Sequence, residues 1–279
     1  MSKSLRTLIK ILSAILAVAL IVAGIIYIPG IPETLDSSFM LSAHTDSAAK
    51  LIAHRGMSAL YPENTIPAFE GAKEYGFYGF EFDLHTTKDG KWIVIHDDVV
   101  DHMTGSTGDV EAYTFEEIRK LKIDGGSNIE NYDGLIMPTL EETLDVCKDS
   151  DIVPVIEIKK CDVQYLPSLK DTLDEYGMSD KAVIISFEKE YLEEYRKLDK
   201  DVDILFLAKV LTKDDVDWCI ENDFGVNFNC WLLFKSFTAV IYARKNDVKM
   251  AAWTVNNPVF GDVMVLMGAE YITTNKILP

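Results

Sequence analysis

The sequence predicts an α/β fold, a (β/α)8 TIM barrel of parallel strands, preceded by an N-terminal transmembrane helix. Three observations predict the barrel. Short apolar runs recur through residues 50–279, helix-like segments separate them, and the count is eight when an early hairpin is treated as part of the second strand. Strands that are apolar on both faces suit a parallel sheet with helices around it. A doubly wound open sheet is the alternative, but it needs a switch point in strand order that the sequence does not show.

Residues 1–30 are predicted to be a membrane anchor. Residues 1–10 include three basic side chains and no acidic one, and residues 11–28 are eighteen positions without a charge. That length is about the minimum for crossing the hydrocarbon core of a bilayer. A cleaved signal peptide is the alternative, but it would have a shorter apolar region and a small-x-small cleavage site. We expect an uncleaved, single-pass anchor in the cell membrane, with the rest of the chain on the extracytoplasmic side.

Residues 31–49 contain Pro, Ser, Thr and Asp without an apolar period, and are predicted to be a linker. The globular barrel domain is then expected at residues 50–279. The chain carries a net charge of −18, which disfavours nucleic acid as a partner. A phosphate-bearing substrate would therefore need positive charge placed locally at its site. No obligatory protein partner is evident, and four scattered cysteines without a C-x-x-C pair argue against a zinc or redox site.

Strands and helices are expected to alternate along residues 50–279, as a barrel requires. The expected strands are residues 51–54, 79–96 (the hairpin), 152–158, 182–186, 203–208, 225–229, 249–255 and 271–274. The expected helices are residues 66–75, 114–121, 139–148, 164–176, 189–198, 213–221, 234–246 and 258–267. Thr114 and Thr139 are each followed three residues later by a glutamate, which is the pattern of a capping box.

The hairpin has a predicted register. Asp89-Gly90 is a strong signal for a two-residue type I′ turn, which would place Asp83 opposite His96. Since side chains alternate between the faces of a strand, one face would be polar and the other apolar. The polar face would carry Glu81, Asp83, His96 and Asp98, and the apolar face Phe80, Phe82, Leu84, Ile93 and Ile95.

Chemistry in such barrels takes place at the carboxyl ends of the strands. Polar residues gather at those ends: His54, Arg55, Glu81, Asp83, Glu157, Lys159, Trp253, Thr273 and Thr274. Three carboxylates brought together suit a hard divalent cation, and a phosphodiester would need the Arg and Lys charges. The alternative is that Glu157–Lys159 and Asp83–His96 are plain ion pairs, which are costly to bury unless they serve a purpose. The large ring of Trp253, at the end of a strand, could wall the pocket.

Four short motifs occur in order: His54-Arg55-Gly56, Pro62-Glu63-Asn64-Thr65, Glu81-x-Asp83 and His96-Asp97. Together they resemble the glycerophosphodiester phosphodiesterase family of phospholipase C-like TIM barrels. The resemblance implies that Glu81, Asp83 and Glu157 bind a divalent metal, Ca²⁺ or Mg²⁺. It also implies that His54 and His96 act as general acid and base, and that Arg55, Glu63 and Lys159 hold the phosphate and the glycerol end.

The implied reaction is metal-dependent hydrolysis of a glycerophosphodiester to sn-glycerol 3-phosphate and an alcohol. A lysophospholipase D-like activity on lysophospholipids, a glycosidase with paired carboxylates and a catalytically inactive surface barrel are the alternatives. The motifs depart from the family pattern at two places. Asp101-His102-Met103-Thr104 replaces an Arg-Thr-Thr stretch, and Thr273-Thr274-Asn275-Lys276 replaces a T-D-x-P ending. Both departures put the substrate-binding loops in doubt.

Overall fold

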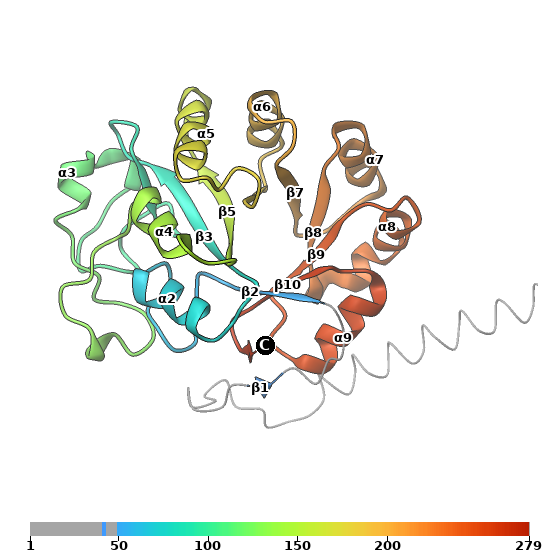
Figure 1. Ribbon diagram of the computed structural model, residues 1–279, viewed down its shortest axis with the longest axis horizontal. Coiled ribbons are helices and arrows are strands. Elements are labelled where there is room, and N and C mark those ends of the chain that lie inside the picture. Colours follow the sequence, from blue (N-terminus) through green and yellow to red (C-terminus); the bar gives the residue numbers. More distant parts are fainter. Residues whose placement is uncertain (1–40, 43–48, 279) are drawn as a thin grey trace, which may run out of the picture. The chain divides into compact units, whose positions relative to one another are not determined.

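The computed structural model describes residues 41–42 and 49–278, and a closed barrel of parallel strands forms the centre of this part of the chain (Figure 1). The barrel strands are β2 (Lys50–Ala53), β3 (Gly79–Thr86), β5 (Val153–Lys160), β6 (Val183–Ser186), β7 (Asp203–Ala208), β8 (Gly225–Asn229), β9 (Met250–Trp253) and β10 (Tyr271–Thr274). Each pairs in parallel with the next, and β2 pairs with both β3 and β10, which closes the ring. The predicted barrel is confirmed, since every expected strand is present.

Helices surround the barrel and cover the outer face of its strands (Figure 1). They are α2 (Ile66–Glu74), α3 (Phe115–Ile118), α4 (Leu140–Cys147), α5 (Leu166–Glu175), α6 (Lys189–Leu198), α7 (Lys213–Asn222), α8 (Leu233–Lys245) and α9 (Pro258–Met267). Short 3-10 helices lie at Val110–Ala112, Ile129–Asn131, Val163–Tyr165 and Cys230–Leu232. Both predicted capping boxes, at Thr114 and Thr139, are confirmed, and Thr212 forms a third one with Asp215.

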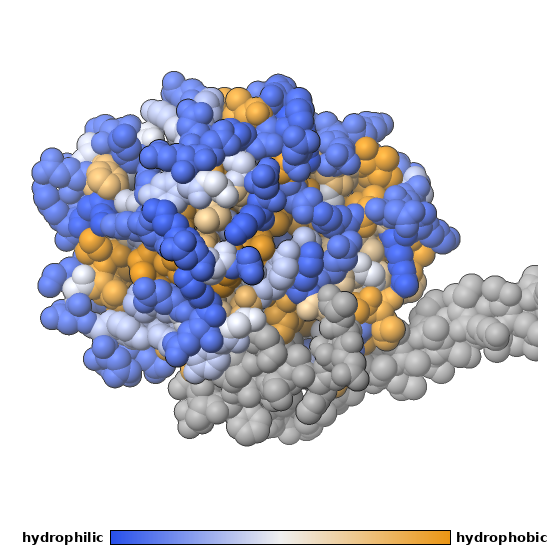
Figure 2. Space-filling model, viewed as in Figure 1, coloured by the Kyte–Doolittle hydropathy of each residue, from blue (hydrophilic) through white to orange (hydrophobic). Residues whose placement is uncertain are grey.

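Apolar side chains fill the interior of the barrel below its carboxyl-terminal mouth. They come from alternate positions of six strands: Ile52, Val153, Val155, Val183, Ile185, Leu205, Leu207, Ala251 and Tyr271. Gly225 belongs to the same region, where a Cβ would come 2.4 Å from Leu205 Cδ2. The site at the mouth therefore rests on a packed apolar floor rather than on a pore. The outer surface, in contrast, is mostly hydrophilic in the view of Figure 2.

The register predicted for the hairpin is wrong by one residue. β4 (Trp92–Val94) is antiparallel to β3, with Leu84 opposite Val94 and Thr86 opposite Trp92. The turn has three residues, and of Lys88, Asp89 and Gly90 only the glycine adopts a left-handed conformation, at φ 72°. Asp89 instead accepts hydrogen bonds from Thr87 Oγ1 and from the backbone N–H of Phe115. Those contacts hold Asp89 in a right-handed turn followed by a glycine bulge.

The shifted register changes which side chains share a face. The backbone N–H of Ile95, not His96, donates to the carbonyl of Asp83. Ile93 and Ile95 therefore lie apart from the Phe80–Leu84 face predicted for them, and they pack in a second apolar cluster with Val100, Val110 and Met137 among others. His96 reaches the barrel mouth from the segment after β4, and Asp98 is exposed rather than part of the polar group.

The predicted transmembrane segment, residues 11–28, lies outside the described residues. Of the residues that are described, none belongs to a helix both long enough and apolar enough to cross a membrane. Within the stretch predicted to be a linker, β1 (Leu41–Ser42) pairs in parallel with β11 (Ile277–Leu278).

Candidate active site at the mouth of the barrel

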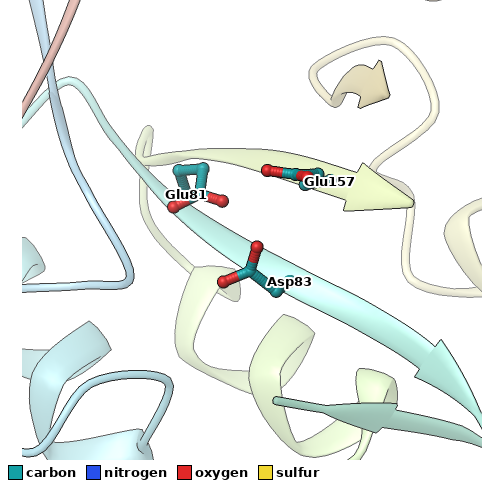
Figure 3. A group of neighbouring side chains, drawn as sticks. All are labelled: Glu81, Asp83 and Glu157. Carbon is teal, nitrogen blue, oxygen red and sulfur yellow. The ribbon is translucent and has the colours of Figure 1, made fainter. Parts of the chain in front are cut away.

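Three carboxylates from two neighbouring strands converge at the mouth. Glu81 and Asp83 lie two residues apart on β3 and so share a face, and Asp83 is in register with Glu157 on β5. One oxygen of each carboxylate can be chosen so that all three lie within 4.8 Å of one another (Figure 3). The three residues are 2%, 1% and 8% exposed, in that order. Their convergence confirms the geometry predicted from the strand ends.

Burial and mutual repulsion disturb the titration of these acids. Burial and the charge of Asp83 raise the pKa of Glu81 well above its usual value. The same two causes raise the pKa of Glu157 to about 7, although the Lys159 ammonium lies 3.0 Å from Glu157 Oε1. Burial acts in the same direction on Asp83, but the Arg55 guanidinium and other nearby positive groups lower its pKa below the usual value. The cluster thus has more acid than its own cations neutralise.

The carboxylate cluster fits a hard divalent cation. Glu81 Oε1 and Asp83 Oδ1 are buried and accept no hydrogen bond from any described residue. The Lys159 ammonium lies 3.8 Å from Asp83 Oδ1, which is longer than a hydrogen bond. Buried polar atoms are nearly always paired, so two unpaired oxygens in one cluster require an explanation. Carboxylate oxygens are the ligands that Ca²⁺ and Mg²⁺ prefer, and a cation among them would satisfy both atoms.

The turn after β2 brings Arg55 to the carboxylates. Arg55 adopts a left-handed φ of 55°, and its backbone N–H donates to Glu81 Oε2 at 2.8 Å. Its Nη1 donates to Glu63 Oε1 at 2.8 Å, and its Nε lies 3.6 Å from Asp83 Oδ2. Gly56 follows at φ 73°, where a Cβ would come 2.6 Å from the carbonyl carbon of Ala68. The local shape of this turn therefore accounts for the glycine of the His54-Arg55-Gly56 motif.

Asn64 is a site residue that the sequence analysis did not identify. Its Nδ2 donates to Asp83 Oδ2 at 2.8 Å, and its Oδ1 accepts from the backbone N–H of Asp83 at 3.3 Å. Asn64 is 3% exposed and adopts a φ of 54°, which asparagine tolerates better than most residues. Its position beside Glu63, just before α2, could have marked Asn64 as part of the site. The residue type alone does not indicate that its amide would hold Asp83.

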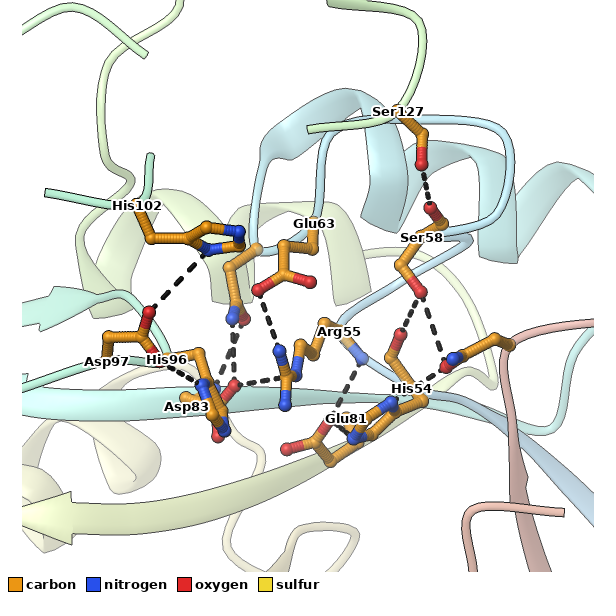
Figure 4. A network of polar contacts seen from close by, with 12 residues as sticks. His54, Arg55, Ser58, Glu63, Glu81, Asp83, His96, Asp97, His102 and Ser127 are labelled. Atoms are coloured by element: carbon orange, nitrogen blue, oxygen red, sulfur yellow. Dashed lines mark hydrogen bonds and ion pairs between the residues drawn. The ribbon is translucent and has the colours of Figure 1, made fainter. Parts of the chain in front are cut away.

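His54 and His96 lie on either side of the carboxylate cluster, His54 beside Glu81 and His96 beside Asp83 (Figure 4). His54 Nδ1 is 2.7 Å from Asn275 Oδ1, and its Nε2 is 4.0 Å from Glu81 Oε2. Burial and the Arg55 charge lower the pKa of His54 to about 4. Asn275 lies in the Thr273–Lys276 stretch, which departs from the T-D-x-P ending of the family. This stretch nevertheless holds His54 in place.

His96 is held by its neighbour along the chain. Its Nδ1 lies 2.6 Å from Asp97 Oδ1, and His102 Nδ1 lies 3.6 Å from Asp97 Oδ2 (Figure 4). Of the two plain ion pairs in the alternative interpretation, that of Glu157 with Lys159 is present, whereas no pair of Asp83 with His96 occurs among the contacts of the described residues. His102, with 63% of its side chain exposed, lies at the outer end of this network.

The cavity at the mouth has a polar and an apolar side. The polar side consists of the predicted residues His54, Arg55, Glu81, His96, Glu157 and Lys159. The apolar side includes Ile185, Phe187, Leu207 and Trp253, with Asn227 among them. Trp253 stands edge-on to Phe187 with ring centroids 5.6 Å apart, and its Nε1 donates to the carbonyl of Asn227 at 3.1 Å. Trp253 thus forms a fixed wall of the cavity, as predicted, whereas Glu63 lies behind Arg55.

Comparisons with known proteins agree with this geometry. The sequence model of the glycerophosphoryl diester phosphodiesterase family matches residues 54–278. A glycerophosphodiester phosphodiesterase of Caldanaerobacter subterraneus is 34% identical over an alignment of 235 residues that covers 81% of this chain and 93% of the relative.

Solved structures share the fold. A glycerophosphodiester phosphodiesterase of Parabacteroides distasonis superposes with a TM-score of 0.71 at 24% identity, covering 83% of this chain and 94% of the other. A phosphodiesterase of Oleispira antarctica, solved with the product sn-glycerol-3-phosphate, superposes with a TM-score of 0.74 at 21% identity. The match covers 86% of this chain and 94% of the other. Since the family match spans most of its length, the chain belongs to the glycerophosphoryl diester phosphodiesterase family of enzymes.

Proposed function

We propose that this chain hydrolyses glycerophosphodiesters to sn-glycerol 3-phosphate and an alcohol, with a divalent cation and two catalytic histidines. One observation carries the proposal: three buried carboxylates with two unpaired oxygens lie between His54 and His96, with Arg55 and Lys159 beside them. The Oleispira antarctica phosphodiesterase of the same fold, solved with sn-glycerol-3-phosphate, supports the choice of product.

Glu81, Asp83 and Glu157 would hold the cation, which is Ca²⁺ or Mg²⁺ because all three donors are carboxylate oxygens. When bound there, the cation would neutralise charge that develops on the phosphoryl oxygens. Asn64 keeps the Asp83 carboxylate in place through its amide, and the Arg55 backbone N–H does the same for Glu81. Groups that orient metal ligands in this way commonly change metal affinity when they are removed.

Arg55 and Lys159 would bind the phosphodiester. Both side chains are largely buried, with 18% and 17% exposed, and both line the cavity. Arginine can contact two phosphoryl oxygens at once, and Glu63 fixes its guanidinium for that purpose. In a chain of net charge −18, these two cations supply the local attraction that an anionic substrate needs.

The histidines would move protons on opposite sides of the phosphoryl group. Asn275 and Asp97 each contact Nδ1 of one ring, so Nε2 is the nitrogen that each ring has available for the substrate. One histidine would take a proton from the attacking hydroxyl, of water or of the neighbouring glycerol carbon. The other would protonate the leaving oxygen, and each role contributes about 10²- to 10⁴-fold to such reactions.

Product analysis tests the proposal. Incubation of the full chain with glycerophosphoethanolamine and Ca²⁺ or Mg²⁺, followed by ³¹P NMR, should show the diester signal replaced by that of glycerol 3-phosphate. A catalytically inactive barrel that still binds the cation would leave the diester signal unchanged, and phosphoethanolamine as the product would show cleavage on the wrong side of the phosphorus.

We further propose that residues 11–28 anchor the enzyme in the cell membrane with its catalytic domain on the extracytoplasmic side. The support is the uncharged apolar run and the basic residues before it. The full chain should then sediment with membranes and be digested by protease added to spheroplasts. Recovery of the full chain in the soluble fraction would contradict the anchor.

A further inference from the structure

Asn227 is a polar residue on the apolar side of the cavity. It lies at the centre of β8, in register with Leu207 on β7 and Ala251 on β9, and neither neighbour offers its side chain a hydrogen bond. Asn227 is 3% exposed, and its Oδ1 is buried without a hydrogen-bond partner among the described residues. Native proteins rarely leave a buried amide oxygen unpaired, so this atom points to a donor that arrives with a ligand.

The position of Asn227 restricts what that donor is. The phosphoryl group belongs on the opposite side of the cavity, with Arg55 and Lys159. An amide oxygen between apolar walls suits a neutral hydroxyl attached to a short carbon chain. A cationic leaving group is less suited to these walls, because the Lys209 ammonium already lies 5.8 Å from the centroid of the Phe187 ring.

We propose that Asn227 Oδ1 accepts a hydrogen bond from a hydroxyl of the glyceryl part of the substrate, and that Asn227 thereby selects glycerol over chains without that hydroxyl. The inference rests on the proposed function, since it assigns the glyceryl side of the same reaction. Phe187 and Trp253 would pack against the carbon chain. A site built to bind a hydroxyl discriminates strongly against substrates that lack it, because its own polar group is then left unpaired.

The structure allows the side chain of Asn227 to be changed without moving the wall. Trp253 Nε1 is held by the backbone carbonyl of Asn227, which every substitution retains. Asn227→Leu has nearly the same shape and removes a buried, unpaired amide. The variant should therefore have a melting temperature equal to or above that of the wild type.

The test uses three substrates with the same leaving group and charge: the 4-nitrophenyl diesters of glycerol 3-phosphate, of propane-1,2-diol 1-phosphate and of propane-1,3-diol phosphate. The propane-1,2-diol ester lacks the terminal glycerol hydroxyl, and the propane-1,3-diol ester lacks the central one. Asn227→Leu should lower kcat/KM for the glyceryl ester by about 10- to 100-fold, as expected for loss of a buried hydrogen bond. On the propanediol ester that lacks the bound hydroxyl, wild type and variant should have equal kcat/KM.

Leu205→Val is the matched control, because Leu205 belongs to the apolar floor and does not line the cavity. It should affect all three esters alike. An equal loss on all three esters with Asn227→Leu, or no loss on any, would overturn the inference while leaving the hydrolase intact. A wild-type chain that hydrolyses none of the three contradicts the proposed function, and the inference falls with it.

Discussion

Asp97 Oδ1 lies 2.6 Å from His96 Nδ1, and the other oxygen of the same carboxylate lies 3.6 Å from His102 Nδ1. The short contact ties His96 to the residue that follows it, so its ring has one preferred orientation toward the mouth of the barrel. The outer contact is longer and more exposed, and exposed ion pairs contribute little. The chain therefore holds His96 through Asp97 and not through His102.

Asp97→Asn should lower kcat by about 10- to 100-fold. This loss is smaller than the full rate contribution of a positioned acid or base, about 10²- to 10⁴-fold, because His96 itself remains. The amide can no longer hold the His96 N–H in the same way, and among the described residues the carboxylate otherwise contacts only His102. His102→Gln is the matched control and should change kcat less than about threefold. Steady-state kinetics of both variants with glycerophosphoethanolamine would test this, and equal losses in the two variants would contradict it.

Asn64→Gly should weaken Ca²⁺ binding by about 10- to 100-fold, because Asp83 loses the amide that orients it. Glycine tolerates the left-handed backbone at this position, so the change removes the amide without adding strain. Asn128→Gly is the control, since Asn128 has a φ of 51° and its amide donates to the carbonyl of Leu60 rather than to a carboxylate. Calorimetric titration of each full-length variant gives the affinities. Unchanged affinity in Asn64→Gly would show that Asp83 needs no such support.

Metal binding should strengthen as the pH rises. The pKa of Glu157 is raised to about 7, so most of this carboxyl carries a proton at pH 6 that must leave before a cation binds. The pKa of Glu81 is raised as well, which acts in the same direction. Competition at Glu157 alone makes the affinity about tenfold higher at pH 8 than at pH 6. Calorimetry in two buffers of different ionisation enthalpy should also detect proton release at pH 6. Constant affinity over this range would mean that the acids are already ionised.

The four cysteines should be unreactive in the folded chain. All four, Cys147, Cys161, Cys219 and Cys230, are buried and free, and burial raises the pKa of each thiol to about 12. Because the thiolate is the reactive form, iodoacetamide at pH 8 should label none of them until the chain is denatured. Intact-mass spectrometry before and after denaturation counts the labels. Rapid labelling of the native chain, or a disulfide, would contradict the burial.

Much of the site could be predicted because parallel strands of a barrel all end at one mouth. Apolar runs located the strands, so the residues that follow them, such as His54 after β2 and Lys159 on β5, had to meet. The predicted grouping of Glu81, Asp83 and Glu157 needed only strand register and side-chain alternation. Family motifs added roles to these residues and did not alter their positions.

The remainder depended on side-chain contacts that residue type does not reveal. Asp89-Gly90 indicated a two-residue turn, but hydrogen bonds from Thr87 and Phe115 hold Asp89 in a three-residue turn and shift the register. Asn64 and Asn227 could each have been ordinary turn or strand residues by sequence. Only the packing shows that one amide holds Asp83 and that the other is left unpaired in the cavity.

The central claim is that the three carboxylates and two histidines form one metal-dependent hydrolase site. The most direct measurement is the rate of glycerol 3-phosphate release by the full chain with Ca²⁺, with Mg²⁺ and with chelator, in wild type, His54→Ala, His96→Ala and Glu81→Gln. Glu111→Gln is the control, since it removes an acid that pairs with Lys160 outside the cavity. We predict release that needs the cation, survives in Glu111→Gln and falls by at least about 100-fold in the other three variants. Release that persists in chelator, or in both histidine variants, would contradict the account.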